Sequence, residues 1–133
     1  MNPLVLDTHA LVWALFDRKQ LSPAAAAALE DANRSNSPVY VRSICIVEII
    51  YLVERGRLPG EAINALWDVL DSPTTNLKTA PLDRGVAERV GRIPRAAVPE
   101  MPDRIIAATA AHVGLPLVTR DRRIQSAGLA VVW

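Results

Sequence analysis

Short apolar segments alternate with longer helical segments along this chain, and this alternation limits its fold more than any other feature. The segments at 4–6 and 116–118 are apolar at consecutive positions, as expected of strands buried on both faces of a parallel sheet. Such strands need helices on both sides, so the pattern predicts an α/β protein with three α/β/α layers and a mostly parallel central sheet. Because the chain has 133 residues, no linker and no internal repeat, residues 1–133 are expected to form one domain.

The expected elements follow from apolar periodicity and capping residues. Ser22-Pro23 combines an N-cap residue with proline at the first helical position, which is a strong helix start. Ser43 is likewise expected to cap the helix after the second strand. Strands are expected at 4–6, 39–41, 76–79, 116–119 and 129–132, and helices at 10–16, 23–33, 43–55, 60–70, 82–93 and 103–113.

Composition and charge narrow the class of protein. Half of the residues are hydrophobic and 22% are charged, which is typical of a globular domain. The net charge of +1 argues against a protein that binds nucleic acid by bulk electrostatics. The single cysteine, Cys45, lies in an apolar run and is expected to be a buried structural thiol. No signal peptide and no membrane-length apolar run is apparent, so the cytoplasm is the expected location and no membrane partner is expected.

Four acidic residues are expected to meet at the carboxyl edge of the sheet, where ligands bind in such folds. Asp7 follows the first strand directly, and Glu48 lies in the second turn of the helix after the second strand. A helix rises ~1.5 Å per residue and a strand ~3.3 Å, so the chain leaves this edge at Asp103 and returns to it at Asp121. The pattern therefore predicts one cleft lined by Asp7, Glu48, Asp103 and Asp121.

Each of these acids also has a structural explanation. The three aspartates could each cap a helix, and Glu48 could be an ordinary solvated helix residue. A functional role for these acids is favoured because Asp7 lies at the end of a buried strand and Glu48 lies within an apolar run. Carboxylates brought close together repel one another unless a cation neutralises them. A ligand set made only of oxygens selects Mg²⁺ or Mn²⁺ rather than Zn²⁺.

The sequence lacks the motifs of several other kinds of catalytic or binding site. The glycines form neither a G-x-G-x-x-G motif nor a Walker motif, and there is no nucleophile elbow. Two histidines and one buried cysteine are too few for a zinc site. His112 is expected to pack or cap, whereas His9, which is closer to the cleft, could contact a substrate or serve a local structural role.

Four segments occur in the order found in PIN-domain nucleases: 6–13, 43–48, 102–110 and 117–121. Together they make nearly the whole chain resemble the VapC-type toxins of that family. The resemblance implies a three-layer α/β/α fold, one or two Mg²⁺ or Mn²⁺ ions, and endonucleolytic cleavage of RNA. It also implies that the family's four acidic positions, which bind metal and carry catalysis, correspond to Asp7, Glu48, Asp103 and Asp121.

Further positions follow from the resemblance and from the neighbours of the acids. Thr119 matches a hydroxyl position found beside the metals, and we expect it to help bind the substrate. Glu100 departs from the aspartate that many relatives carry before the third acid, and is a candidate outer carboxylate with a longer side chain. Arg104 and Arg120 each follow or precede a cluster acid and are candidates to bind the RNA backbone. A purely structural pairing with a carboxylate is the alternative for both arginines.

These observations predict a metal-dependent endoribonuclease that acts as the toxin of a toxin–antitoxin pair and hydrolyses RNA phosphodiester bonds. A non-catalytic PIN-like module that binds RNA or protein is the alternative, although none of the four acids is lost. A phosphatase or receiver-like domain is disfavoured because it would need a late lysine, and Lys78 is the last one.

The expected partners are RNA, a cognate antitoxin and a second copy of the chain. One helical stripe is strongly apolar, and a domain this small could leave it uncovered, which would indicate an interface. The resemblance implies that such helices serve dimerisation and antitoxin docking. The alternative is that the stripe closes the domain's own core. Its residues are Ile63, Leu66, Trp67 and Leu70, beside Ile49, Ile50 and Val53 on the preceding helix.

Overall fold

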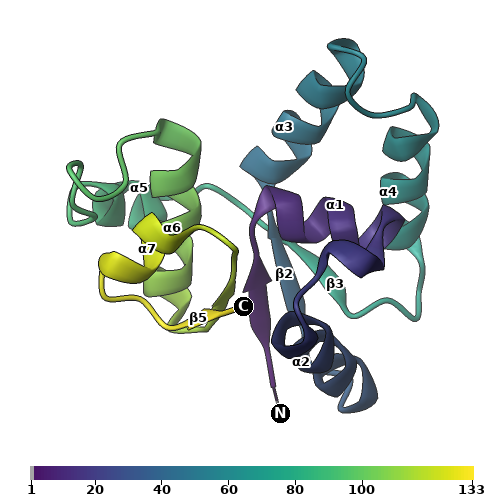
Figure 1. The fold of residues 1–133 in the computed structure, drawn as a ribbon, viewed down its shortest axis with the longest axis horizontal. Coiled ribbons are helices and arrows are strands. Elements are labelled where there is room, and N and C mark those ends of the chain that lie inside the picture. The colour runs from purple at the N-terminus through teal and green to yellow at the C-terminus, as the bar shows by residue number, and fades with distance from the viewer. Residues whose placement is uncertain (1) are drawn as a thin grey trace.

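The computed structural model describes residues 2–133, so Met1 of the expected domain 1–133 lies outside the described residues. The described part contains seven α-helices and five strands (Figure 1). The strands are β1 (Leu4–Leu6), β2 (Val39–Arg42), β3 (Leu77–Ala80), β4 (Leu117–Val118) and β5 (Val131–Val132). The helices are α1 (Thr8–Phe16), α2 (Pro23–Arg34), α3 (Ser43–Glu54), α4 (Glu61–Asp71), α5 (Arg84–Val90), α6 (Met101–Val113) and α7 (Arg122–Ser126), with a short 3₁₀ turn at Arg18–Gln20.

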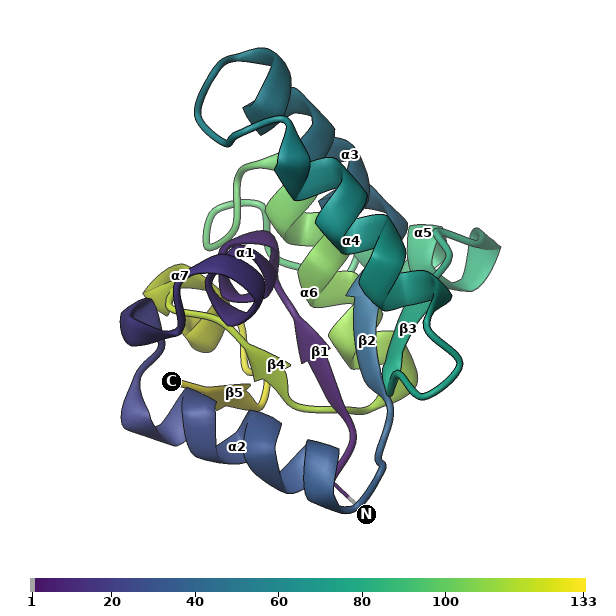
Figure 2. The same ribbon diagram turned by 90° about the vertical axis from the view of Figure 1, so that its right-hand side faces the viewer.

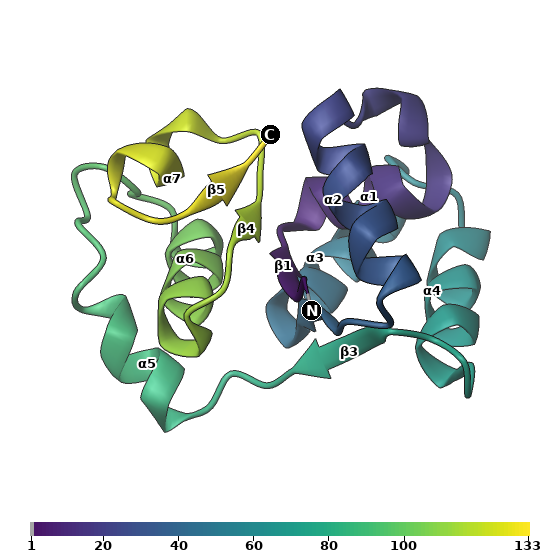
Figure 3. The same ribbon diagram turned by 90° about the horizontal axis from the view of Figure 1, so that it is seen from below.

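The strands form one sheet in the order β3-β2-β1-β4-β5, and all neighbouring pairs are parallel. The chain runs outward from β1 to β3 and then crosses back to β4. Because parallel crossovers are right-handed, this reversal places the later helices on the opposite face from the earlier ones. Figure 3 shows α1, α2 and α4 on one side of the strands and α5, α6 and α7 on the other. In Figure 2, α2 lies beside β5, close to the C-terminus.

The core lies on both faces of this sheet. Val5, Val41 and Leu117, from three neighbouring strands, are completely buried, which explains why these strands are apolar at successive positions. Cys45 is also completely buried, as predicted, and burial raises the pKa of its thiol to about 12. No helix in the described part of the chain is long and apolar enough to cross a membrane.

A buried arginine joins two strands at the carboxyl edge of the sheet. Arg42, the last residue of β2, is 1% exposed. Its Nη1 donates to the carbonyl oxygens of Ala80 at 3.0 Å and Pro81 at 3.2 Å. Burial lowers the pKa of this guanidinium because the charged form loses its hydration. Arg42 therefore holds the ends of β2 and β3 together near the edge where the acidic residues lie.

Arg42→Ala is expected to lower the free energy of unfolding by about 3 kcal/mol, because it leaves a cavity and two carbonyl groups without their donor. Arg42→Met removes the buried charge but keeps most of the volume, so it should cost clearly less. Urea denaturation followed by circular dichroism measures both variants. Equal losses would mean that the hydrogen bonds, and not the filled volume, decide the contribution of Arg42.

Several expected boundaries are wrong. Arg42, and not Ser43, is the N-cap residue of α3, and the Ser43 hydroxyl instead donates to the Ala80 carbonyl oxygen at 3.4 Å. The helix expected from Asp103 begins two residues earlier, so Asp103 lies in the first turn of α6 and does not cap it. The helix expected at 82–93 is shorter because Asp83 caps it, accepting a hydrogen bond from the Val86 amide at 3.0 Å. The last two strands are also shorter than expected.

Candidate active site at the carboxyl edge of the sheet

Asp7 is placed by the junction between β1 and α1. Its backbone amide donates to the Val118 carbonyl oxygen at 3.2 Å, which continues the pairing of β1 with β4. Its side chain accepts from the Ala10 amide at 2.8 Å and so caps α1. Asp7 is 9% exposed, and burial raises its pKa, although a hydrogen bond with Thr119 partly offsets this. The cap explanation is therefore correct for Asp7, but capping alone does not require a buried charge.

Asp121 and Asp103 are linked by an arginine that the sequence had not singled out. Asp121 caps α7, and its Oδ1 accepts from the Arg123 amide at 2.9 Å. The Arg123 guanidinium lies 3.2 Å from Asp121 Oδ2 and 3.7 Å from Asp103 Oδ2. Asp103 reaches this point from the first turn of α6. The two aspartates therefore face each other across one exposed guanidinium, although they belong to different helices.

Glu48 is held at the start of α1. Its Oε1 accepts a hydrogen bond of 2.7 Å from the Thr8 hydroxyl, which fixes the carboxylate close to the residue after Asp7. Glu48 lines a hollow of about 560 Å³ together with His9 and Glu100. Glu100 is exposed, and its side chain makes no capping hydrogen bond at the start of α6.

The three aspartates open into one cleft of about 370 Å³. His9 borders both this cleft and the hollow that contains Glu48, so the two spaces adjoin. One cleft with all four acids was expected. The structure instead places three aspartates in the cleft and Glu48 in the adjoining hollow. The cleft is lined by Asp7, His9, Trp13, Asp103, Arg120, Asp121 and Arg123.

The electrostatics of the cleft favour a cation. Burial is the main cause that raises the pKa of Asp103, and the charges of Asp121 and Glu48 raise it further. Ionised aspartates here therefore repel one another. Among residues 2–133, no three acidic, histidine or cysteine side chains lie close enough to enclose a metal ion as they are placed. Arg123 instead lies between Asp103 and Asp121, and 55% of its side chain is exposed. The all-oxygen donor set fits a hard divalent ion.

The family model described as PIN domain matches residues 4–129. This chain belongs to the PIN domain family. The predicted three-layer fold with a parallel sheet is therefore confirmed, both by the observed topology and by the family match.

This PIN domain is similar to several known proteins over nearly its whole length. It is 30% identical to Ribonuclease VapC22 of Mycobacterium tuberculosis over 126 residues, which are 95% of this chain and 92% of the relative. The structure of VapBC2 from Rickettsia felis bound to a promoter DNA fragment superposes with a TM-score of 0.74 at 18% identity, covering 97% of this chain and 96% of that one. FitAcB from Neisseria gonorrhoeae gives a TM-score of 0.64 at 27% identity, covering 96% and 95%.

Arg104 is engaged elsewhere in this PIN domain. Its Nη2 donates to the carbonyl oxygens of Val90 at 2.8 Å and Ile93 at 3.0 Å, which ties α6 to the end of α5. It does not line the cleft. We therefore correct the expectation for Arg104: it has a structural role, although its partners are carbonyl groups and not a carboxylate.

Thr119 has the expected position but a different role from the expected one. It is completely buried, so it cannot contact RNA directly. Its hydroxyl hydrogen-bonds Asp7 and accepts from the Asp121 amide at 3.0 Å. Thr119 thus orients two of the cleft's acids, and its place beside the site agrees with the resemblance.

Two other residues have clear positions. The His112 ring packs against Gly85, so closely that a Cβ built on the glycine would lie 2.6 Å from it, which agrees with the expected packing role. Arg123 was missed because an arginine two residues after an aspartate is common. Only the fold brings it to Asp103, which lies far away in the sequence.

Proposed function

We propose that this PIN domain is an endoribonuclease that depends on Mg²⁺ or Mn²⁺ and acts as the toxin of a toxin–antitoxin pair in the cytoplasm. The observation that carries the proposal is that Asp7, Asp103 and Asp121 line one cleft, while burial and the charges of neighbouring acids raise the pKa of Asp7 and Asp103. The similarity to a protein named as a ribonuclease supports RNA as the substrate. The similarity to FitAcB and to structures of VapBC and of another toxin–antitoxin complex, from Klebsiella pneumoniae, supports the biological role.

Four carboxylates would hold the ion in this proposal. Asp7, Asp103 and Asp121 do so from the cleft, and Glu48 from the adjoining hollow. When bound, a divalent ion lowers the pKa of a water molecule and stabilises negative charge on the phosphoryl oxygens. No side chain forms a covalent bond to the substrate.

The chain's own residues prepare the site for this reaction. Thr119 hydrogen-bonds the Asp7 side chain and accepts from the Asp121 backbone amide, and Thr8 donates to Glu48, so two carboxylates and the start of α7 are held before a substrate arrives. Arg123 neutralises Asp103 and Asp121 until it swings away, and can then contact an RNA phosphate from the rim together with Arg120. Glu100 remains the candidate for an outer carboxylate.

The test is cleavage of RNA by the purified chain. Labelled single-stranded RNA should be cut internally when Mg²⁺ or Mn²⁺ is present, and DNA of the same sequence should stay intact. If the chain binds RNA without cutting it under any of these conditions, the alternative of a non-catalytic PIN-like module is correct and the proposed activity is not.

The apolar surface available to protein partners is smaller than the sequence predicted. Leu66 and Ile49 of the predicted apolar stripe are completely buried, so much of the stripe closes the domain's own core. The large apolar side chains left exposed on α3 and α4 are Trp67, Val47 and Tyr51, at 38%, 45% and 55%. We assign these exposed side chains to contacts with a second copy of the chain and with the antitoxin; Val47 and Tyr51 also line the hollow that contains Glu48.

The isolated protein is expected to be a dimer by light scattering at micromolar concentrations. Trp67→Ala should shift it toward the monomer with little change in melting temperature, because this side chain is partly exposed and contributes little to the core. Leu66→Ala is the matched comparison, since the neighbouring side chain is fully buried and its loss should lower stability by about 3 kcal/mol. A monomeric wild type would remove the basis for the interface.

A further inference from the structure

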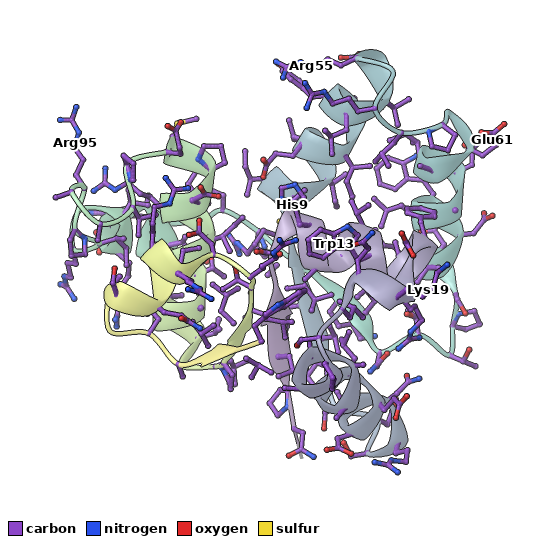
Figure 4. The ribbon with its side chains drawn as sticks, in the orientation of Figure 1. His9, Trp13, Lys19, Arg55, Glu61 and Arg95 are labelled. Carbon is purple, nitrogen blue, oxygen red and sulfur yellow. The ribbon has the colours of Figure 1, made fainter. Side chains whose placement is uncertain are left out.

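One wall of the acidic cleft is aromatic. His9 and Trp13 lie one turn apart on α1, and their ring centroids are 5.5 Å apart. Figure 4 shows both side chains projecting from this helix. The guanidinium carbon of Arg120 lies 5.8 Å from the centroid of the Trp13 ring. We call His9, Trp13 and Arg120 the aromatic shelf. All three line the same cleft as the aspartates.

The shelf is held in place before any ligand binds. Its helix begins directly after Asp7, so the rings and this carboxylate are fixed to one rigid element. Trp133, near the end of the chain, supports the Trp13 ring at a centroid distance of 5.6 Å. His9 is exposed and Trp13 is half-buried, so the rings are both anchored and accessible.

We infer that the aromatic shelf binds one unpaired nucleobase of the RNA next to the phosphate that is cut, with Arg120 contacting the backbone. This inference rests on the proposed function and names the form of RNA that the site accepts. Bases stack on aromatic side chains and on arginine planes, and such stacking tolerates any sequence because every base has a π-face.

The charge of the molecule makes local stacking important. A net charge of +1 supplies little general attraction for a polyanion, and the cleft itself is acidic. Binding must therefore draw on contacts at the cleft, where the rings and Arg120 offer an apolar surface beside a cation. A base inside a duplex is already stacked and paired, so the shelf selects single-stranded RNA.

The test measures whether the shelf and one base act together. Binding is followed by fluorescence polarisation of a labelled single-stranded RNA of mixed sequence, in an Asp103→Asn background that prevents cleavage. The same RNA is then prepared with one abasic nucleotide, moved through each position in turn. Protein variants are Trp13→Leu, Trp13→Phe and His9→Ala. Phe16→Leu is the matched control, since Phe16 is an exposed aromatic residue on the same helix that does not line the cleft.

One abasic position should lower the affinity of the intact shelf about tenfold. The same abasic nucleotide should hardly change the affinity of Trp13→Leu, because this variant lacks the ring on which the base stacks. Phe16→Leu should behave like the intact protein, and Trp13→Phe should keep most of the effect. With Asp103 restored, Trp13→Leu should raise KM for RNA cleavage much more than it lowers kcat. If Trp13→Leu does not fold, His9→Ala carries the test, because this exposed side chain should lose part of the coupling without loss of structure.

The outcomes separate this inference from the proposed function. If the wild type cuts RNA, but the loss of affinity at every abasic position is the same with and without Trp13 or His9, the aromatic shelf is wrong and the ribonuclease proposal stands. If one abasic position lowers affinity only when Trp13 and His9 are present, but the wild type never cuts RNA, the ribonuclease proposal is wrong and the aromatic shelf stands. If the shelf is instead occupied by a partner protein, neither the abasic nucleotide nor Trp13→Leu changes RNA binding, and the inference is wrong.

Discussion

Asp7→Asn and Asp103→Asn are each expected to lower the rate of RNA cleavage at least about a hundredfold while leaving the metal-free protein as stable as the wild type or more so. Activity should fall because each change removes one of the charged oxygen ligands. Stability should hold because asparagine caps a helix as well as aspartate does, so the bond from the Ala10 amide to residue 7 survives. The rate is measured on labelled RNA and stability by thermal melting in EDTA.

The sign of the stability change follows from the raised pKa values. Asp7 and Asp103 have pKa values above 3.8 in the folded protein, so the folded state binds more protons than the unfolded state between 3.8 and the raised values. Stability of the metal-free wild type should therefore fall as the pH rises through that range. Both variants should lack part of this pH dependence, and should gain most relative to wild type at neutral pH.

Asp83→Asn is the matched control for Asp7→Asn. Asp83 caps α5 with the same geometry, accepting from the Val86 amide at 3.0 Å, but it does not line the cleft. The substitution should leave cleavage unchanged. If Asp7→Asn unfolds the protein, or if Asp83→Asn reduces cleavage equally, Asp7 acts as a helix cap and its catalytic assignment is wrong.

Excess EDTA is expected to abolish cleavage by the wild type, and added Mg²⁺ or Mn²⁺ should restore it, whereas Zn²⁺ should not. The reason is the oxygen-only donor set and the repulsion among Asp103, Asp121 and Glu48 that a cation would relieve. Undiminished cleavage in EDTA would contradict the metal-dependent mechanism directly.

Thermal melting gives a second measurement that does not depend on activity. A metal ion that binds only the folded protein stabilises it by about 2 to 3 kcal/mol at a hundred times its Kd. Mg²⁺ or Mn²⁺ should therefore raise the melting temperature of the wild type. The same ions should have little effect on Asp103→Asn, since one ligand of the site is missing.

Except for the short helix α7, which was not among the expected helices, the order and type of the helices and strands were predictable because they depend on local patterns. Apolar runs marked the buried strands, and Ser22-Pro23 marked the start of α2, where Ser22 does accept from the Ala25 amide at 3.0 Å. Boundaries were less predictable because neighbouring segments decide them. The start of α6 at Met101 and the capping of α3 by Arg42 depend on where the preceding strand or loop ends in space.

The site was predictable to the extent that topology alone controls it. A residue that directly follows a strand of a parallel sheet must lie at its carboxyl edge, so Asp7 could be placed from the sequence. Asp103 and Asp121 could be brought to the same edge from the lengths of the helix and strand between them. Glu48 was placed only approximately, because its hydrogen bond with Thr8 turns it into the adjoining hollow.

The sequence by itself determined the fold class and the presence of acidic groups at one edge of the sheet, because periodicity and residues next to strand ends are local properties of the chain. The family followed from the resemblance of four segments to PIN-domain nucleases. The tertiary structure alone decided which partners those groups meet. Arg104 reaches two carbonyl groups instead of the cleft, Arg123 lies between Asp103 and Asp121, and Trp133 supports Trp13. Each of these contacts joins residues from different elements, and the packing of long side chains across elements is not encoded in any local pattern.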